Sequence, residues 1–506
     1  MSELLPGFEP PPFVPAPTRD AAAVIVFRRV AGGAETFWIK RDKALSFAGG
    51  FYAFPGGKVD KADAAIPVAG AKGVDAALRV TAARELLEET GLLVAVGAER
   101  TSAEDRAAMR RALLEKKAGF AELLAERGLT LDAAHFPDAG RWVTPPHLPG
   151  RFDARFFLVE APVGQGAEVW PGELSFGAWT APEAALAQWR AGTALLHPPN
   201  RHALEVLRGL RDVPSALAAL RHPPHCVDFI AGRIEFQQGV LVVPLRTPTL
   251  PPATHTNTYV LGTKELLVVD PGSPDPAETA QLIALLEALR SEGAVLRAVV
   301  PTHHHGDHVG GLEQVVKALG LPVWAHPRTA DRLPVPTARL LTEGDVLSLA
   351  GGERWVVRHT PGHAQGHVCL VDERSRAMVV GDMVAGTGTI VIDPPEGDMA
   401  QYLAQLERLR ALGPTTLYPA HGAPSPDGAG KLTEYLQHRA WREGKVRAAL
   451  SAGPGTLEAL VPRAYDDVQA FVWPLAERST LAILQKLEAE GLAARSGETW
   501  RAVSPG

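Results

Sequence analysis

Apolar and polar positions along the chain predict short β-strands separated by helices. Apolar runs typical of strands lie at residues 22–28 and 37–40, and again at residues 296–300 in the second half. Apolar residues recur at helical spacing between residues 102 and 129 and between residues 202 and 220. This mixture predicts a multidomain protein of the α/β and α+β classes.

After residue 430 the pattern is mainly helical and ends in a predicted hairpin. The expected elements are three helices and two strands, at residues 431–449, 457–465, 479–490, 492–495 and 500–503. Three helices followed by a hairpin are typical of a small winged-helix module, a type that binds nucleic acid in many proteins. A packing role, in which the module caps or dimerises the preceding domain, explains the same pattern equally well.

The composition is that of a folded protein with several domains. The 506 residues are 46% hydrophobic and 21% charged with a net charge of -6, which excludes a disordered chain and a global basic field. Two cysteines, Cys226 and Cys369, exclude a disulfide scaffold and fit a reducing compartment. No run approaches the roughly 20 apolar residues of a membrane helix, and no targeting segment is recognisable. We expect a soluble cytoplasmic protein without a membrane partner.

These patterns divide the chain into four predicted segments. Residues 1–19 contain six prolines and are expected to form a disordered tail. We expect a first domain at residues 20–225, a second at residues 226–430, and the winged-helix-like module at residues 431–506.

A histidine-rich loop directly after the strand at residues 296–300 is the most informative motif. Residues 302–308 read THHHGDH. Alternate residues of such a loop can direct their imidazoles at one metal ion, while Asp307 and His308 reach a second ion. Three further ligand candidates each follow an apolar, strand-like run, namely His363, Asp382 and His421. Two metal ions are therefore expected.

This ordered set resembles the metallo-β-lactamase superfamily, whose HxHxDH signature is complete here. The resemblance implies an αβ/βα sandwich with a binuclear metal site. The implied ligands are His303, His305 and His363 for one ion, Asp307, His308 and His421 for the other, and Asp382 as the bridge. It also implies that Asp270, at the end of an earlier strand, supports the metal loop without binding a metal.

The donor types indicate the metal and the reaction. Zinc is expected for a site rich in imidazole, while iron or manganese fit the same ligands. Two such ions activate water and polarise a carbonyl or phosphoryl group, so hydrolysis is the expected reaction. Asp307 is expected to be catalytic as well as a ligand.

A second constellation, of acidic residues, lies upstream on a predicted helix. Glu85, Glu88 and Glu89 fall at positions i, i+3 and i+4, which places three carboxylates on one helix face. Like charges at this spacing repel each other unless a divalent cation neutralises them, and carboxylate oxygens suit Mg²⁺. Taken alone, the carboxylates are equally explained by an acidic stripe on a surface helix.

The surrounding residues resemble the Nudix box, Gx5Ex7REUxEExGU, from Gly57 to the helix that carries Arg84. The resemblance implies an α/β/α sandwich, Mg²⁺ or Mn²⁺ bound by the three glutamates as catalytic residues, support from Arg84, and hydrolysis of a nucleoside-diphosphate-linked substrate. The loop half departs from the pattern, because Asp63 replaces the first glutamate and 20 residues instead of 7 separate it from Arg84. Long insertions here resemble the Nudix subgroup that includes coenzyme A diphosphatases.

The HxHxDH domain with a winged-helix-like tail is similar to the β-lactamase-like protein 2 group, whose members are endoribonucleases on single-stranded RNA. The first helix of the tail is basic, and we expect phosphate contacts there from Lys431, Arg439, Arg442, Lys445 and Arg447. We therefore expect a bifunctional metal-dependent hydrolase, a ribonuclease joined to a Nudix diphosphatase. The alternative is a thioester hydrolase similar to glyoxalase II, with a Nudix domain that only binds a nucleotide and regulates. The oligomeric state stays open.

Overall fold

The computed structural model describes residues 13–45, 48–148, 150–386 and 388–503. The chain forms two compact units, one from Val14 to Gln238 and one that begins at Gly239 and includes Phe13. The division lies later than the limit predicted near residue 225. Most of the predicted tail at residues 1–19 lies outside the described residues, but its last two residues already belong to the first strand, which begins at Thr18.

The N-terminal unit is built on a mixed sheet with the strand order β3-β2-β1-β8-β7, in which β4 also pairs with β1 and β9 with β2. Its strands are β1 (Thr18–Val30), β2 (Gly33–Arg41), β3 (Tyr52–Ala53), β4 (Gly56–Lys58), β7 (Asp138–Val143), β8 (Arg151–Glu160) and β9 (Leu174–Thr180). Strand side chains alternate between faces, so Val24 and Val26 of β1 face one side and Ile25 and Phe27 the other. All four are buried, so both faces of the sheet are covered.

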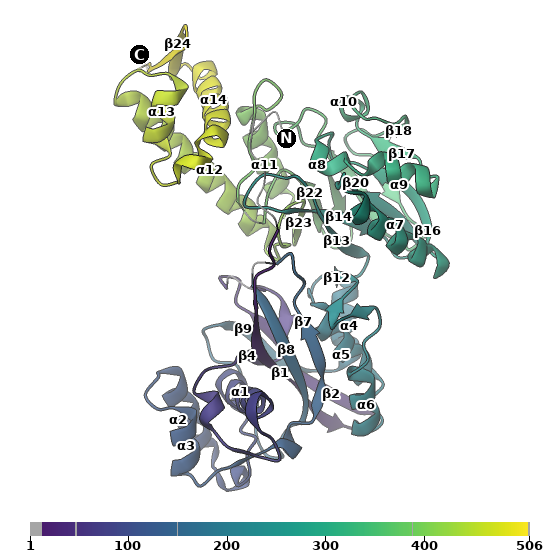
Figure 1. The fold of residues 1–506 in the computed structure, drawn as a ribbon, viewed down its shortest axis with the longest axis vertical. Coiled ribbons are helices and arrows are strands. Elements are labelled where there is room, and N and C mark those ends of the chain that lie inside the picture. The colour runs from purple at the N-terminus through teal and green to yellow at the C-terminus, as the bar shows by residue number, and fades with distance from the viewer. Residues whose placement is uncertain (1–12, 46–47, 149, 387, 504–506) are drawn as a thin grey trace. The chain divides into compact units, whose positions relative to one another are not determined.

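Helices cover both faces of this sheet (Figure 1). α1 (Gly73–Thr90), α2 (Ala103–Leu114) and α3 (Phe120–Glu126) contribute to the core on the Val24 face. α4 (Pro182–Ala191), α5 (Pro198–Arg208) and α6 (Val213–Leu220) contribute to the core on the Ile25 face. The result is a three-layer α/β/α arrangement.

Shorter elements and one correction complete this unit. The remaining short strands are β5 (Val68–Ala69), β6 (Leu131–Asp132), β10 (Cys226–Val227), β11 (Ile230–Ala231) and β12 (Ile234–Gln237). The helical spacing between residues 202 and 220 predicts one continuous helix, and this prediction is wrong because the segment forms α5 and α6. Gly209 follows the last residue of α5, and the side chain of Asp212 caps the start of α6.

Two β-sheets pack together in the C-terminal unit. One includes β13 (Val240–Arg246), β14 (His255–Leu261), β15 (Glu265–Val269), β16 (Val295–Val300), β17 (Val323–Ala325) and β18 (Thr337–Leu340) in that order. The other has the order β19 (Val346–Ser348), β20 (Arg354–His359), β21 (Val368–Asp372), β22 (Met378–Gly381) and β23 (Leu417–Pro419). The rings of Tyr259 on β14 and Tyr418 on β23 lie 5.8 Å apart edge to face, which joins the two sheets.

Helices cover the outer faces of both sheets. α7 (Pro276–Ser291) and α9 (Leu312–Leu319) share a core with β14, β15 and β16. α11 (Met399–Ala411) and α12 (Gly428–Ser451) share a core with β20, β21 and β22. Two short helices, α8 (Gly306–Val309) and α10 (Pro327–Ala330), follow β16 and β17. This is an αβ/βα sandwich, and the predicted mixed multidomain fold is confirmed.

The C-terminal module consists of α13 (Leu457–Ala464), α14 (Trp473–Ala489) and the hairpin β24 (Ala493–Ser496) with β25 (Thr499–Ala502). α14 begins six residues before the predicted start at Ser479, because Pro474 is tolerated in the first turn of a helix. Leu484 and Trp500 belong to the same buried core as Tyr402 of α11. The module is therefore packed into the hydrolase half. Among the described residues, none of the helices combines the length and apolar composition that crossing a membrane requires.

Candidate metal centres

The metal loop after β16 is held by Asp270, which follows β15. The Asp270 carboxylate accepts hydrogen bonds from the Thr302 amide at 2.6 Å and the Thr302 hydroxyl at 2.7 Å, and it lies 2.9 Å from Nδ1 of His308. Asp270 has a φ of 51°, a left-handed conformation that a non-glycine residue rarely adopts. These are the contacts of a residue that orients the loop from behind.

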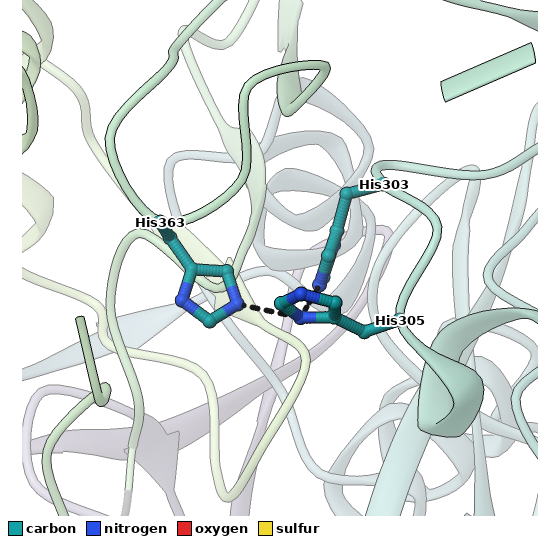
Figure 2. A group of neighbouring side chains, drawn as sticks. All are labelled: His303, His305 and His363. Carbon is teal, nitrogen blue, oxygen red and sulfur yellow. Dashed lines mark hydrogen bonds between the residues drawn. The ribbon is translucent and has the colours of Figure 1, made fainter. Parts of the chain in front are cut away.

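Three imidazoles converge in front of this loop (Figure 2). Nδ1 of His305 lies 3.0 Å from Nε2 of His303 and 3.0 Å from Nε2 of His363. His363 reaches the group from the loop after β20, and Gly362 before it has a φ of 135°. A Cβ at Gly362 would lie 2.4 Å from the backbone of Tyr402, so only glycine fits there. The geometry brings together the three residues predicted as ligands of one ion.

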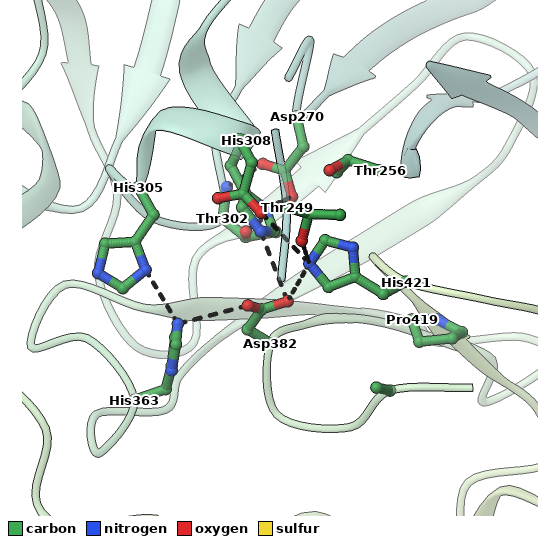
Figure 3. Close-up of polar contacts among 12 residues, drawn as sticks. Thr249, Thr256, Asp270, Thr302, His305, His308, His363, Asp382, Pro419 and His421 are labelled. Carbon is green, nitrogen blue, oxygen red and sulfur yellow. Dashed lines mark hydrogen bonds and ion pairs between the residues drawn. The ribbon is translucent and has the colours of Figure 1, made fainter. Parts of the chain in front are cut away.

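Asp382 lies between this group and the second set of predicted ligands (Figure 3). Its carboxylate is 3.4 Å from Nε2 of His363 on one side, and 3.4 Å from His308 and 3.3 Å from His421 on the other. Donor atoms of Asp307, His308 and His421 all lie within 4.8 Å of one another. Asp382 follows β22, and His421 follows β23, so strand ends deliver both residues to the same edge of the sandwich.

The free donor atoms in this cluster fit metal ions. Nε2 of His308 and Oδ1 of Asp382 are buried and lie 3.4 Å apart, and among the described residues neither atom makes a hydrogen bond. An unsatisfied buried polar atom costs about 1–3 kcal/mol, which a metal ion at this position would offset. The outer nitrogens of the imidazoles are already held, since Nδ1 of His363 lies 2.9 Å from the carbonyl of Val391 and Nδ1 of His421 3.1 Å from that of His255. Such partners leave the opposite nitrogen as a metal donor.

Burial and neighbouring charge shift the protonation of this cluster. Burial, with repulsion from His308 and His305, lowers the pKa of His303 well below its usual range. Burial would also lower the pKa of His308, but the carboxylates led by Asp382 raise it well above the usual range. Burial opposes ionisation of Asp382, yet His421 and His308 hold the pKa of its carboxyl well below the usual range. The cluster therefore favours an ionised carboxylate at its centre.

Neighbouring residues add contacts that the motif does not contain. Nε2 of His304 lies 3.4 Å from the carboxylate of Glu396, which is also 3.7 Å from Nε2 of His305. The Thr249 hydroxyl lies 3.4 Å from Nε2 of His421. Sequence reasoning missed Glu396 and Thr249, because each belongs to a segment without a motif that reaches the site only through the fold.

A separate group of carboxylates lies on α1 of the N-terminal unit. Nη1 of Arg84 donates to Glu85 at 2.8 Å and to Glu88 at 3.2 Å. Glu89 accepts a hydrogen bond from the Gly56 amide at 2.8 Å. A Cβ at Gly57 would lie 2.3 Å from the Glu85 carboxylate, so glycine lets this loop approach the helix. Helix and loop thus meet at Glu85 and Glu89.

Asp63 takes part in this group by holding Arg84. Its buried carboxylate accepts from Nε and Nη2 of Arg84 at 3.0 and 2.9 Å, and from the Thr81 hydroxyl at 2.7 Å. Asp63 therefore contacts Arg84 in spite of the long insertion between them. Asp63 orients the arginine that in turn contacts Glu85 and Glu88.

Burial raises the pKa of all three glutamates of α1. Burial raises the pKa of Glu85 to about 7, against the lowering effect of Arg84. Burial, followed by repulsion from Glu85, raises the pKa of Glu89 well above its usual range. Glu173, which sequence reasoning missed, adds repulsion at Glu88 and Glu89. Strongly raised pKa values of buried carboxylates are typical of functional sites, and in the described residues the glutamate oxygens do not form a group within 4.8 Å.

The basic residues predicted to contact phosphate are mostly engaged inside the protein. The prediction is wrong for Arg439 and Arg442, because both are buried. Arg439 donates to the carbonyl of Ile390, and Arg442 forms two 2.8 Å hydrogen bonds with Asp467. Lys431 pairs with Glu434, and Lys445 with Asp466 and Asp467, whereas Arg447 is exposed.

Two family models match parts of the C-terminal unit. Residues 251–421 match the metallo-beta-lactamase superfamily, and residues 456–500 match the beta-lactamase associated winged helix domain. The second match confirms the predicted winged-helix module.

Curated relatives from animals and fungi are similar to this chain. A beta-lactamase-like protein 2 homolog of Caenorhabditis elegans is 32% identical over 196 residues, covering 38% of this chain and 64% of the relative. An atrochrysone carboxyl ACP thioesterase of Aspergillus novofumigatus is 33% identical over 224 residues, covering 42% and 66%. The lactamase-like protein aptB of Emericella nidulans is 31% identical over 228 residues, covering 42% and 69%. The chain spans just under two thirds of the length of the first two.

Two solved structures are similar to parts of this chain. A metallo-beta-lactamase family protein from Thermus thermophilus has 24% identity and a TM-score of 0.45, covering 52% of this chain and 99% of that one. A Nudix hydrolase from Alicyclobacillus acidocaldarius has 30% identity and a TM-score of 0.36, covering 41% and 99%. Because residues 251–421 match the family model and the Emericella relative is covered over 69% of its length, the chain belongs to the metallo-β-lactamase superfamily and is a hydrolase.

Proposed function

We propose that the C-terminal unit is a binuclear metallohydrolase that cleaves an acyl thioester. The observation that carries the binuclear site is the place of Asp382, 3.4 Å from His363 and 3.3 Å from His421. One ion would be held by His303, His305 and His363, the other by Asp307, His308 and His421, with Asp382 shared. Zinc suits these donors, and iron or manganese fit them as well.

The chain's own residues orient the donors and leave one side open to substrate. Bound divalent ions supply Lewis acidity toward a carbonyl or phosphoryl group and activate water. The imidazoles of His303 and His308 are buried, whereas the side chains of His305 and Asp307 keep 32% and 15% of their surface exposed. Substrate therefore approaches past His305 and Asp307, and the Asp307 carboxylate is placed to accept a proton or hydrogen bond on that side.

Two observations favour a thioester over RNA as the substrate. One relative is named as an ACP thioesterase. In addition, RNA binding depends on basic side chains that are free to meet phosphates, and here Arg439 and Arg442 are buried in internal contacts. Single-stranded RNA is the second candidate, supported by the likeness to a beta-lactamase-like protein 2 homolog and by the winged-helix domain.

For the N-terminal unit we propose a Nudix diphosphatase that uses Mg²⁺ or Mn²⁺. The supporting observation is that Arg84 joins Asp63 to Glu85 and Glu88, while Glu89 accepts from the Gly56 loop. The carboxylates would hold the cation, and one of them would take the proton of the attacking water. A thioester of coenzyme A contains both a thioester and a diphosphate, so both units would act on one class of molecule.

The test assays three proteins, wild type, Asp382→Ala and Glu88→Gln, on acyl-coenzyme A and on a labelled single-stranded RNA. We expect wild type to release the free thiol, Asp382→Ala to lose this activity together with bound metal measured by mass spectrometry, and Glu88→Gln to lose only diphosphate cleavage. RNA cleavage that disappears in Asp382→Ala would move the C-terminal assignment to a ribonuclease. Unchanged metal content in Asp382→Ala would contradict the shared-ligand role, and diphosphate cleavage that persists in Glu88→Gln would contradict the Nudix assignment.

A further inference from the structure

The segment between Asp382 and α11 contributes two groups to the metal centre. We refer to residues 388–398 as the site loop. The carbonyl of Val391 lies 2.9 Å from Nδ1 of His363. The carboxylate of Glu396 lies 3.4 Å from His304 and 3.7 Å from His305. The site loop contains no strand or helix. It contacts His363 through Val391, and His304 and His305 through Glu396.

The site loop is held from behind by the winged-helix domain. Ser479 of α14 accepts a hydrogen bond from the amide of Ile392 at 3.4 Å. The neighbouring Arg478 lies 3.5 Å from the carboxylate of Asp393. These contacts lie one and two residues beyond Val391, so α14 supports the loop directly next to the carbonyl that faces His363.

Helix α12, which leads into the winged-helix domain, holds the other side of the site loop. The buried guanidinium of Arg439 donates to the carbonyl of Ile390. The Tyr435 hydroxyl donates to the carbonyl of Gly388 at 3.3 Å. Ile390 and Ile392 are buried in the core that also contains Leu484. Residues on either side of Val391 are therefore fixed to α12 and α14.

Backbone groups at successive residues explain how this support reaches the metal centre. The Ile390 carbonyl is bonded to Arg439, the Ile392 amide to Ser479, and the Val391 carbonyl between them contacts His363. A neutral imidazole has one donor and one acceptor nitrogen, so a carbonyl at Nδ1 fixes Nε2 as the acceptor. The acceptor nitrogen is the one that faces His305 and Asp382.

From these contacts we infer that α12 and the winged-helix domain are a working part of the hydrolase site. Arg439 and Ser479 are positioning residues, which hold Val391 so that His363 presents Nε2 to a metal ion. The inference rests on the proposed binuclear centre. It assigns the domain a role in metal binding by the same chain.

The test uses three variants. One carries both Arg439→Met and Ser479→Ala, one carries Ser479→Ala alone, and the third, Thr480→Val, is the control. Thr480 is the next residue on α14, is fully buried, and donates to the Ala476 carbonyl of its own helix at 2.7 Å. Zinc binding is measured by competition with a chromophoric chelator, and thermal unfolding of the metal-free proteins is measured alongside. The visible spectrum of the cobalt-substituted proteins reports the geometry at the imidazole site.

We expect the wild type to bind two zinc ions, and the double variant to bind one of them roughly 10–100-fold more weakly, as for other residues that orient metal ligands. Ser479→Ala alone should show a smaller loss of zinc affinity, and Thr480→Val should match the wild type. When Arg439→Lys replaces Arg439→Met in the double variant, part of the zinc affinity should return. The inference would be overturned if Ser479→Ala and the double variant both bound two zinc ions at wild-type affinity. It would also be overturned if Thr480→Val lost as much zinc affinity as they do. A wild type that binds no zinc would instead refute the proposed centre.

Discussion

At the scale of single residues, Asp63 departs from the motif but still contacts the arginine of the motif, Arg84, in the folded chain. Its buried carboxylate is bonded to Arg84 and Thr81 although 20 residues separate it from Arg84 in the sequence. Removal of one partner from a buried charged pair costs about 3 kcal/mol, because the other charge stays buried. We predict that Asp63→Ala lowers the free energy of unfolding of the N-terminal unit by about this amount, measured by hydrogen exchange of the core amides of β1.

Asp60→Asn is the matched control for this prediction. Asp60 lies three residues away and is exposed, and its side chain accepts a hydrogen bond from the Ala62 amide through Oδ1, an atom that asparagine retains. The unfolding free energy of the Asp60→Asn variant should stay within about 0.5 kcal/mol of the wild-type value, as for most surface substitutions. If Asp63→Ala is as stable as Asp60→Asn, then the contact between Asp63 and Arg84 contributes nothing to the stability of the N-terminal unit.

At the scale of elements, α2 holds the end of the helix that carries the glutamates. The buried guanidinium of Arg110 donates to the carbonyls of Glu88 and Glu89 at 2.9 Å each and stacks 4.2 Å from Trp170. The last carbonyls of a helix lack partners within it, and each costs about 1–3 kcal/mol when buried and unpaired. We predict that Arg110→Met increases hydrogen exchange at residues 87–91 and weakens Mg²⁺ binding, measured by calorimetry.

Arg111→Met provides the comparison, because Arg111 is the exposed neighbour and lies 5.9 Å from the same Trp170 ring. It should leave exchange at residues 87–91 and Mg²⁺ affinity unchanged. Equal effects of both substitutions would mean that the stacking on Trp170, and not the contact with the α1 carbonyls, holds the helix end.

The elements also show which features the sequence could predict. The proximity of the predicted ligands on the metal loop and the shared face of the glutamates of α1 were predictable, because close spacing on one loop or one helix face fixes both before the fold is known. Glu396, Thr249 and the Val391 carbonyl were not, since loops without periodicity bring them to the site. The predicted phosphate contact of Arg439 is wrong, because the sequence shows the charge of Arg439 but not that the folded chain buries it against the Ile390 carbonyl.

At the scale of the whole molecule, each unit has its own core, and the N-terminal unit contains a buried histidine that gives it a predicted sensitivity to acid. The ring of His197 in the N-terminal unit stacks on Phe51 at 4.5 Å and meets Phe236 edge to face at 5.2 Å. Burial, with repulsion from Arg41, lowers the pKa of His197 to about 4. In the unfolded chain its pKa is about 6.5, so between pH 6.5 and 4 the unfolded state binds more protons than the folded state.

The stabilisation that neutral His197 provides is therefore complete above pH 6.5 and is lost as the pH falls toward 4. The full loss corresponds to up to about 3 kcal/mol, at 1.36 kcal/mol for each pKa unit. Glu85 acts in the opposite direction, since its pKa is raised to about 7 and its protonation favours the folded state as the pH falls. The effect of His197 therefore has to be isolated by substitution.

We predict that His197→Phe, which keeps an aromatic ring between Phe51 and Phe236, makes the N-terminal unit less sensitive to acid. Between pH 7 and 4.5 the unfolding free energy of the wild type should fall more than that of the variant, by up to about 3 kcal/mol, measured from the β1 amides. The C-terminal unit should show the same acid response in both proteins, because the substitution lies outside its core. Identical pH profiles of the N-terminal unit in both proteins would mean that His197 binds a proton equally well in the folded chain.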